Sequence, residues 1–170
     1  MTTGAIESAD LPLEQGAFFA DTLCTLAGGL EESVGLKGAS TFIAETGTEI
    51  GDQIGGLYAK VLGRTEWSPE QLAAVLVDLK HRIGGEFSVE SVSAEEIVLT
   101  NTRCPFADRV KGRPSLCMMT TTVFGTIAAQ ATGYASVYID EAIALGHSKC
   151  RVLVRLTRAE QTHGYEFFAQ

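Results

Sequence analysis

The segment FSVESVSAEEIVLTN, residues 87–101, decides the fold class of this chain of 170 residues. Apolar and polar residues alternate in its first half, and Glu96–Asn101 is a second strand-like run. Period-two alternation is typical of a strand with one buried face. Ser93-Ala94-Glu95 between the two runs is short enough to be a tight turn. The segment therefore predicts an antiparallel β-hairpin.

Helical patterns precede the hairpin. Apolar residues three or four apart predict a helix that starts at Leu11 and ends near Val34-Gly35. A second helix is expected over residues 39–62. A third is expected from Pro69 to about Ile83, with Ser68 as its N-cap. We expect Cys24 to be a small core residue of the first helix, and His81 to lie at the surface in the last turn of the third.

The second predicted helix is rich in glycine. Gly47, Gly51 and Gly55 are spaced four residues apart, which puts them on one face, and Gly56 follows. Glycine costs about 1 kcal/mol in a helix relative to alanine. Two explanations stay open: another helix or a dimer mate packs closely against this face, or the helix is broken or kinked.

A further helix is predicted from Pro114 to Gly133, and two further strands over residues 136–140 and 150–156. Segregated runs of helices and strands are typical of an α+β domain. We expect an antiparallel sheet covered by an N-terminal helical bundle and one further helix. Residues 1–10 are expected to be a flexible N-terminus, residues 11–158 a single domain and residues 159–170 a C-terminal tail.

Composition limits the function. The chain is 45% hydrophobic and 20% charged, which is typical of a globular protein, and its net charge is −8. An acidic chain is a poor binder of DNA or RNA. No segment has the roughly 18 apolar residues that a membrane span requires, and the N-terminus lacks the layout of a secretory signal. We therefore expect a cytoplasmic protein with reduced cysteines.

Three cysteines lie at the edges of predicted elements. Cys104, followed by Pro105, ends a strand, Cys117 opens a helix, and Cys150 begins a strand. These ends can converge at one rim of a sheet, and amide donors in a first helical turn favour a thiolate at Cys117. Zinc takes tetrahedral thiolate and imidazole ligands, so the three cysteines with His147 are the expected metal site.

Alternatives to this zinc site stay open. Asp140 and Glu141 are alternatives to His147 as the fourth metal ligand. The CxxC pair that usually identifies a zinc site is not present. An iron–sulfur cluster, a haem held at Cys104-Pro105 and a redox-active thiol use the same cysteines. Three unligated cysteines are the remaining alternative.

Four residues near these cysteines are expected to bind a small-molecule ligand. Met118, Met119 and Phe106 are candidates for a pliable apolar pocket. Arg103 belongs to a basic cluster with Arg109, Lys111 and Arg113, which attracts an anion or is simply solvated. No GxSxG, P-loop, HExxH or GxGxxG motif is present, so a binding module is favoured over an enzyme.

Two segments, NTRCPF (residues 101–106) and PSLCMMTTTVFGTIAAQATGYASVYIDEAIALGHSKCRVLV (residues 114–154), carry a family resemblance. Across roughly residues 85–156 the chain resembles the methanogen output domain family. That family is similar to vinyl-reductase-type (4-vinyl reductase-like) sensory domains of bacteria, which share a fold with trafficking-complex subunits.

The resemblance also implies a site. Some bacterial activators that sense aromatic compounds carry this sensory domain. In them, a cysteine at a helix start and a cysteine after a Gly-His turn belong to a zinc site, and Cys117 and Cys150 match these two cysteines. The third cysteine of that pattern is absent, because residues 141–145 are EAIAL, and Cys104 is the candidate to replace it.

The resemblance implies a stand-alone sensory or regulatory module. We expect it to bind a small ligand or respond to redox state, and to signal as a homodimer or through a protein partner. The alternative is a small cysteine-dependent enzyme, a hydrolase or a reductase relative.

Overall fold

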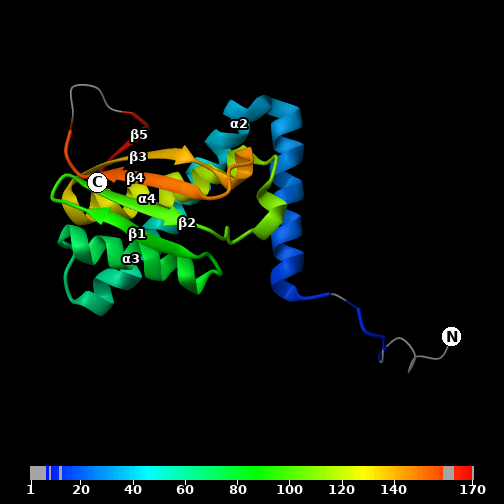
Figure 1. Cartoon of the computed structure of the whole chain (residues 1–170), viewed down its shortest axis with the longest axis horizontal. Helices are drawn as coiled ribbons and strands as arrows, with labels where there is room; N and C mark the ends of the chain where they lie inside the picture. Colours follow the sequence, from blue (N-terminus) through cyan, green and yellow to red (C-terminus); the bar gives the residue numbers. More distant parts are fainter. Residues whose placement is uncertain (1–6, 8, 12, 159–162, 170) are drawn as a thin grey trace.

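The computed structural model describes residues 7, 9–11, 13–158 and 163–169 (Figure 1). The described part is an α+β domain, which confirms the predicted fold class. Its long elements are α2 (Gln15–Leu62), α3 (Pro69–Arg82), β1 (Phe87–Val92), β2 (Glu96–Asn101), α4 (Cys117–Thr132), β3 (Tyr134–Glu141), β4 (Cys150–Arg155) and β5 (Tyr165–Phe168). The described helices include none with the length and hydropathy that crossing a membrane requires.

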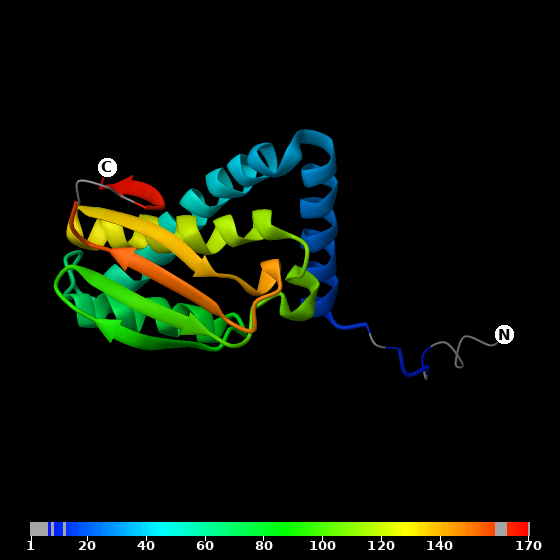
Figure 2. The ribbon, with the colours of Figure 1, turned by 45° about the horizontal axis from the view of Figure 1, so that its top comes forward.

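The five strands form one antiparallel sheet in the order β1-β2-β4-β3-β5. The predicted hairpin is confirmed, with Phe87 opposite Asn101 and Val92 opposite Ile97. The helices α3, α4 and the second half of α2 lie on one face of the sheet, and the other face is open (Figure 2). The side chains between the sheet and the helices, such as Ile97, Phe124 and Val152, are fully buried.

The helix α3 begins and ends as its sequence predicts. The Ser68 hydroxyl accepts a hydrogen bond from the Gln71 amide, and the Gln71 side chain accepts one from the Ser68 amide. This capping box satisfies two of the free amides at the start of the helix. Leu72 and Leu76 face the core of the domain.

The helix α2 is kinked at Gly35, whose φ of 74° and ψ of 167° are not helical. Glycine tolerates this conformation because it has no Cβ. The predicted first helix therefore ends where expected, but helix resumes at once instead of at Ala39. We call residues 15–34 the arm; it stands at one end of the sheet, and the rest of α2 runs back along α4 (Figure 1).

The glycine face of α2 packs on α4 of the same chain. A Cβ at Gly47 would lie 2.9 Å from Cβ of Thr122, and one at Gly51 would lie 2.9 Å from Cβ of Thr126. The two helices approach too closely for any side chain at these glycines. The partner of this face is thus a helix of the same chain, and neither a dimer mate nor a break in the helix explains the glycines.

The C-terminal segment corrects a prediction. Residues 159–170 were expected to be a tail, but Tyr165–Phe168 forms β5, which pairs with β3 at the edge of the sheet. Phe167 fills the space left by Gly125, where a Cβ would overlap its ring. The strand forms because its backbone pairs with β3, which is distant in the sequence. A run of four residues is too short to predict such a strand. The predicted flexible residues 1–10 lie mostly outside the described residues, as do residues 159–162.

The arm leaves most of its large apolar side chains exposed. Its periodicity predicted a helix and Cys24 as a core residue, and the side chains that the arm buries are small ones, including Cys24 and Ala27. Cys24 is 6% exposed, which confirms its place in a core. Phe18 and Leu26 are 61% and 60% exposed. The arm reaches beyond the sheet, so the described residues offer its large side chains no surface to cover.

Candidate functional site: a cavity lined by three cysteines and a lysine

Cys104, Cys117 and Cys150 line one cavity of about 80 Å³ at the end of the sheet beside the arm. Cys104 follows β2, Cys117 begins α4, and Cys150 begins β4. The convergence expected from their positions at element edges is therefore present. Most of the remaining wall is aliphatic or aromatic and includes Ile83, Phe87, Val110, Leu116, Ile139 and Val152.

Buried polar contacts hold the chain in place where it enters the cavity from β2. The Asn101 carboxamide oxygen accepts hydrogen bonds from the amides of Glu86 and Arg103, each at 3.1 Å. Asn101 is 2% exposed, so these bonds are formed away from water. The Cys104 carbonyl accepts a bond from the Ala107 amide at 2.8 Å. Together they turn the chain so that Cys104 faces the cavity and not the open edge.

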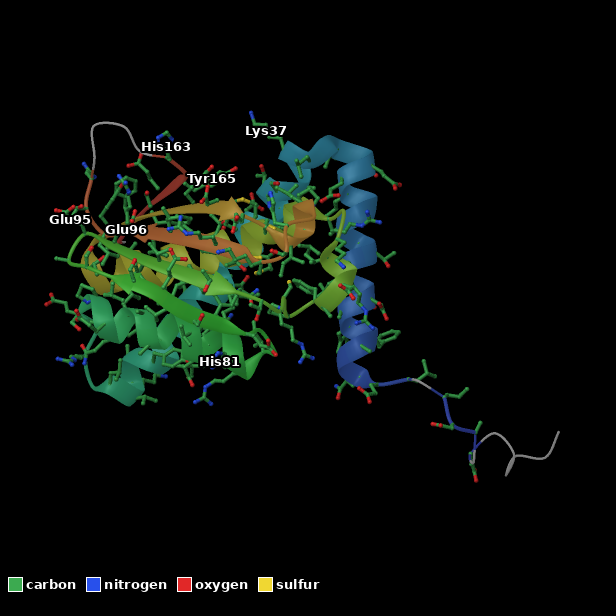
Figure 3. The ribbon with its side chains drawn as sticks, in the orientation of Figure 1. Lys37, His81, Glu95, Glu96, His163 and Tyr165 are labelled. Atoms are coloured by element: carbon green, nitrogen blue, oxygen red, sulfur yellow. The ribbon has the colours of Figure 1, made fainter. Side chains whose placement is uncertain are left out.

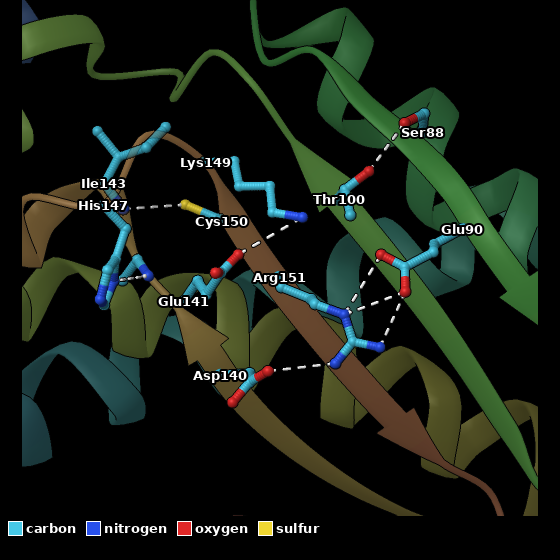
Figure 4. Close-up of polar contacts among 11 residues, drawn as sticks. Ser88, Glu90, Thr100, Asp140, Glu141, Ile143, His147, Lys149, Cys150 and Arg151 are labelled. Carbon is cyan, nitrogen blue, oxygen red and sulfur yellow. Dashed lines mark hydrogen bonds and ion pairs between the residues drawn. The ribbon is translucent and has the colours of Figure 1, made fainter.

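The turn before Cys150 is built around His147. The His147 Nδ1 accepts a hydrogen bond from the Ala142 amide at 3.0 Å, and the Cys150 sulfur accepts one from the Ile143 amide at 3.4 Å (Figure 4). His147 is exposed and does not line the cavity. The structure therefore does not bring it to the three thiols as a fourth ligand; it shapes the turn that presents Cys150.

Asp140 and Glu141 are also engaged elsewhere. Asp140 pairs with Arg151, which also binds Glu90 across the open face of the sheet (Figure 4). Glu141 pairs with Lys149 at 3.6 Å. The two carboxylates that were alternatives to His147 are thus used in ion pairs outside the cavity.

The described residues do not fit a metal centre in this arrangement. Among them, no three His, Cys, Asp or Glu side chains form a group that could hold a metal ion. Burial raises the pKa of Cys104, and burial together with the neighbouring cysteines raises the pKa of Cys117 to about 12. The expected thiolate at Cys117 is therefore wrong for this structure: desolvation outweighs the helix terminus.

Lys80 is a residue of the cavity that the sequence analysis missed. It is 4% exposed, and its Nζ donates a hydrogen bond to the Thr120 hydroxyl at 2.8 Å. The Nζ lies 5.0 Å from the centre of the Phe124 ring and 5.5 Å from that of Phe87. Burial lowers the pKa of Lys80 to about 8. Among the cavity-lining residues that the structure describes, Lys80 is the only charged side chain.

A signal for Lys80 is present in the sequence. Leu72, Leu76 and Lys80 are four residues apart on α3, so they share one helix face. The first two are completely buried. A lysine that continues a buried stripe is either a snorkelling surface residue or a buried cation, and only the tertiary structure distinguishes the two.

Two of the four predicted ligand-binding residues line the cavity, and the other two do not. Met119 and Phe106 line the cavity. Met118 is buried beside a separate open groove between α2, α4 and β5. Arg103 is exposed, and its guanidinium lies 3.7 Å from the Glu86 carboxylate.

The two remaining histidines lie away from the cavity. His81 is exposed on α3, as predicted, and its Nε2 is 2.7 Å from the Phe87 carbonyl oxygen. His163 precedes β5 on the other side of the molecule (Figure 3). Neither lines the cavity, whose polar groups among the described residues are the three thiols, the Lys80 ammonium, the Thr120 hydroxyl and the Asn101 carboxamide.

The chain can be placed among known proteins by its sequence. The family model of methanogen output domain 1 matches residues 23–155. The chain belongs to this family. The matched range includes Lys80 and the three cavity cysteines of this methanogen output domain. Comparison with curated proteins gives no match.

Solved structures with the same fold include a sensory domain. The phenol-responsive sensory domain of the transcription activator PoxR, solved with phenol, matches with a TM-score of 0.67 and 16% identity, over 80% of this chain and 73% of that one. Subunit 3 of a trafficking protein particle complex from Naegleria fowleri, covalently bound to palmitic acid, matches with a TM-score of 0.55 and 15% identity, over 85% of this chain and 99% of that one. At these identities the likeness establishes the fold of the methanogen output domain.

Proposed function

We propose that this methanogen output domain is a sensory module that binds a small molecule in the cavity between Cys104, Cys117 and Cys150. The observation that carries the proposal is the cavity itself. A mostly apolar wall with a few polar groups at fixed positions is the usual form of a small-molecule site. The sensory domain of PoxR, which has the same fold, was solved with phenol and supports this role.

The size of the cavity limits the ligand. Its volume is about 80 Å³, whereas a cavity of about 150 Å³ holds benzene. A long acyl chain such as the palmitic acid of the trafficking subunit does not fit. An aromatic ring requires movement of flexible wall residues such as Met119, whose unbranched side chain repacks easily.

Nuclear magnetic resonance of the full chain labelled with ¹⁵N tests the proposal. Phenol, small alcohols and small carboxylates are titrated, and shifts are expected at the amides of Lys80, Cys117 and Cys150. Ala144→Leu, which adds bulk to a wall residue, is expected to weaken binding at least tenfold. Ala74→Leu on the exposed side of α3 is the matched control and should bind like the unsubstituted chain.

Two results contradict this function. One is the absence of binding by every compound. The other is binding that Ala144→Leu leaves unchanged while its thermal unfolding stays cooperative, because the compound would then occupy another part of the molecule.

We also propose that the protein transmits its signal as a homodimer, in which two copies contact each other through the arm. The arm is tied to the body by the ion pair of Asp21 with Arg109 and by the Glu31 carboxylate, which accepts a bond from the Ser115 amide at 2.9 Å. Its exposed apolar side chains are Phe18, Phe19, Leu23, Leu26 and Val34. A second copy supplies an identical apolar helix, so a two-fold contact covers both.

The arm also gives a route for a signal. It contacts the segments around Cys104 and Cys117 that close the cavity, so a ligand-induced shift there changes how the arms meet. A protein partner that binds the arm is the alternative recipient of the signal.

We also propose a cytoplasmic location, because four free thiols persist in a reducing compartment.

A zinc-bound form is a second candidate, favoured by the convergence of Cys104, Cys117 and Cys150. It requires the three thiols to lose their protons and move closer together, because they form no metal-holding group as they stand. Elemental analysis of protein purified without oxygen tests it, and stoichiometric zinc is the supporting result. A broad visible absorbance would instead identify an iron–sulfur cluster, and a sharp Soret band a haem. Metal-free, colourless protein that is stable to chelators contradicts all three.

A further inference from the structure

The ammonium group of Lys80 is buried without an anion beside it. It carries three donor hydrogens, and among the described residues its one hydrogen-bond acceptor is the Thr120 hydroxyl. No carboxylate lines the cavity in the described part of the chain. The rings of Phe87 and Phe124 offer their faces to the cation, which compensates only part of its lost hydration.

A buried charge is normally paired, because transfer of an ion from water into an apolar interior is costly. The groups that face Lys80 from the neighbouring elements are the thiols of Cys104, Cys117 and Cys150. On α3 itself, Asp78 is bound to Arg82 and Tyr58 and does not line the cavity. The described residues therefore place a cation in a cavity whose lining includes no carboxylate.

We propose that the cavity takes a short-chain organic carboxylate, held by the Lys80 ammonium and the Thr120 hydroxyl. The alkyl part of the ligand would lie against Met119, Ile139 and Ile143. This inference rests on the proposed function, because it names the ligand class of the same cavity. If about 150 Å³ holds the six carbons of benzene, then about 80 Å³ holds about three non-hydrogen atoms. This is close to the four of acetate, and a small movement of the flexible Met119 side chain admits the five of propionate.

The composition of the wall favours a carboxylate over other anions. A phosphate or sulfate brings more charge and needs several charged donors, whereas Lys80 is the one charged group among the described lining residues and is accompanied by the Thr120 hydroxyl and the Asn101 carboxamide. The apolar wall also rewards a ligand with an alkyl part. A monoanion with a small apolar body matches both features of the site.

Isothermal titration calorimetry of the full chain with sodium propionate tests the proposal, in chloride-free buffer at pH 6.5. Propionate is expected to bind, and propionamide, its neutral analogue, at least tenfold more weakly. Lys80→Met should reduce propionate affinity at least tenfold. Lys60→Met removes the same charge from an exposed position of α2 and should leave the affinity unchanged.

Two further measurements keep the test independent of folding defects. Thr120→Val removes the hydroxyl at similar volume and is expected to weaken propionate severalfold. For the unsubstituted chain, affinity should fall as pH rises above about 8, where the free protein loses the Lys80 proton. An affinity that is constant from pH 6.5 to 9.5, or equal for propionate and propionamide, overturns the inference.

The outcomes also separate this inference from the proposed function. Phenol or a small alcohol that binds and is lost in Ala144→Leu, with no binding of propionate, overturns the carboxylate and leaves the sensory cavity standing. Propionate binding that Lys80→Met weakens and Ala144→Leu does not would place the anion outside the cavity. Failure of every compound overturns both.

Discussion

The Lys80 side chain lies inside the protein with a hydroxyl and two aromatic rings around its ammonium group. Its pKa is lowered to about 8 from the 10.5 of a free lysine because burial disfavours the charged form. The folded state thus binds fewer protons than the unfolded state between these two values. Stability rises with pH across that window and carries the full cost of the buried charge below pH 8.

Lys80→Met should therefore stabilise the ligand-free protein at pH 7. A shift of this size corresponds to about 3 kcal/mol, and the Thr120 hydroxyl loses its partner, so we expect a gain of about 1–3 kcal/mol. The gain should shrink as pH rises from 8 to 10.5, since both proteins then bury a neutral side chain. Urea unfolding at pH 7 and pH 10 measures it. A loss of stability at pH 7 would contradict the account.

The cavity thiols should react slowly in the folded protein. Burial raises the pKa of Cys117 to about 12, so almost no thiolate is present at neutral pH. At pH 7.5, we expect iodoacetamide to modify Cys117 at least a hundredfold more slowly than in urea-unfolded protein, as measured by mass spectrometry of peptides. Fast labelling in the folded state would instead support a nucleophilic cysteine and the alternative of a small enzyme.

At the scale of elements, the contact of α2 with α4 sets the position of the cavity. Gly47 and Gly51 let the two helix backbones approach closely, and α4 carries Cys117, Met119 and Thr120. Any increase in the spacing of these helices would shift the first turn of α4, on which three cavity residues lie. The glycines therefore serve the site indirectly, through the placement of a helix.

Gly51→Ala should destabilise the protein by about 1–3 kcal/mol despite the better helix propensity of alanine, because its Cβ would lie 2.9 Å from Cβ of Thr126 and 3.3 Å from the backbone of Val123. Gly56→Ala is the matched control on the same helix. No atom lies within 4 Å of a Cβ there, so that variant should gain up to about 1 kcal/mol. Thermal or urea unfolding compares the two, and equal effects would argue against close packing at Gly51.

At the scale of the whole molecule, the arm is a largely exposed helix attached to a compact α+β domain. The sheet and its helices bury their apolar side chains, whereas the arm leaves large ones in water beyond the end of the sheet (Figure 1). Soluble monomers rarely expose a contiguous apolar patch of this kind. The proposed homodimer removes it from water.

Leu26→Asp should convert the proposed homodimer to a monomer of 18.1 kDa. Leu26 is 60% exposed on the arm, and a carboxylate on each copy would be buried and repelled in a two-fold contact. Val61→Asp, at an 81% exposed position at the other end of α2, is the control and should leave the dimer intact. Analytical ultracentrifugation measures both. An unsubstituted chain that is monomeric at 100 µM, or a dimer that survives Leu26→Asp, would contradict the arm contact.

Local signals in the sequence predicted most elements because each signal acts over a few residues. Ser68 and Gln71 form a capping box from their own spacing, the hairpin follows from alternation, and Gly35 marks the end of the first helix. The apolar stripe of the arm was recognised, but whether a stripe is covered depends on where the helix goes. The strand β5 was missed because its pairing partner is about thirty residues away.

Periodicity and local motifs were enough to predict the α+β class, the membership of the output domain family and the placement of Cys104, Cys117 and Cys150 at the edges of elements. The tertiary structure alone decided what those cysteines face. Packing of α3 and α4 against the sheet places the half-buried thiols beside Lys80 and leaves His147 outside. Burial and proximity are properties of the packed chain, and they are the reason that the three thiols share a cavity with one lysine.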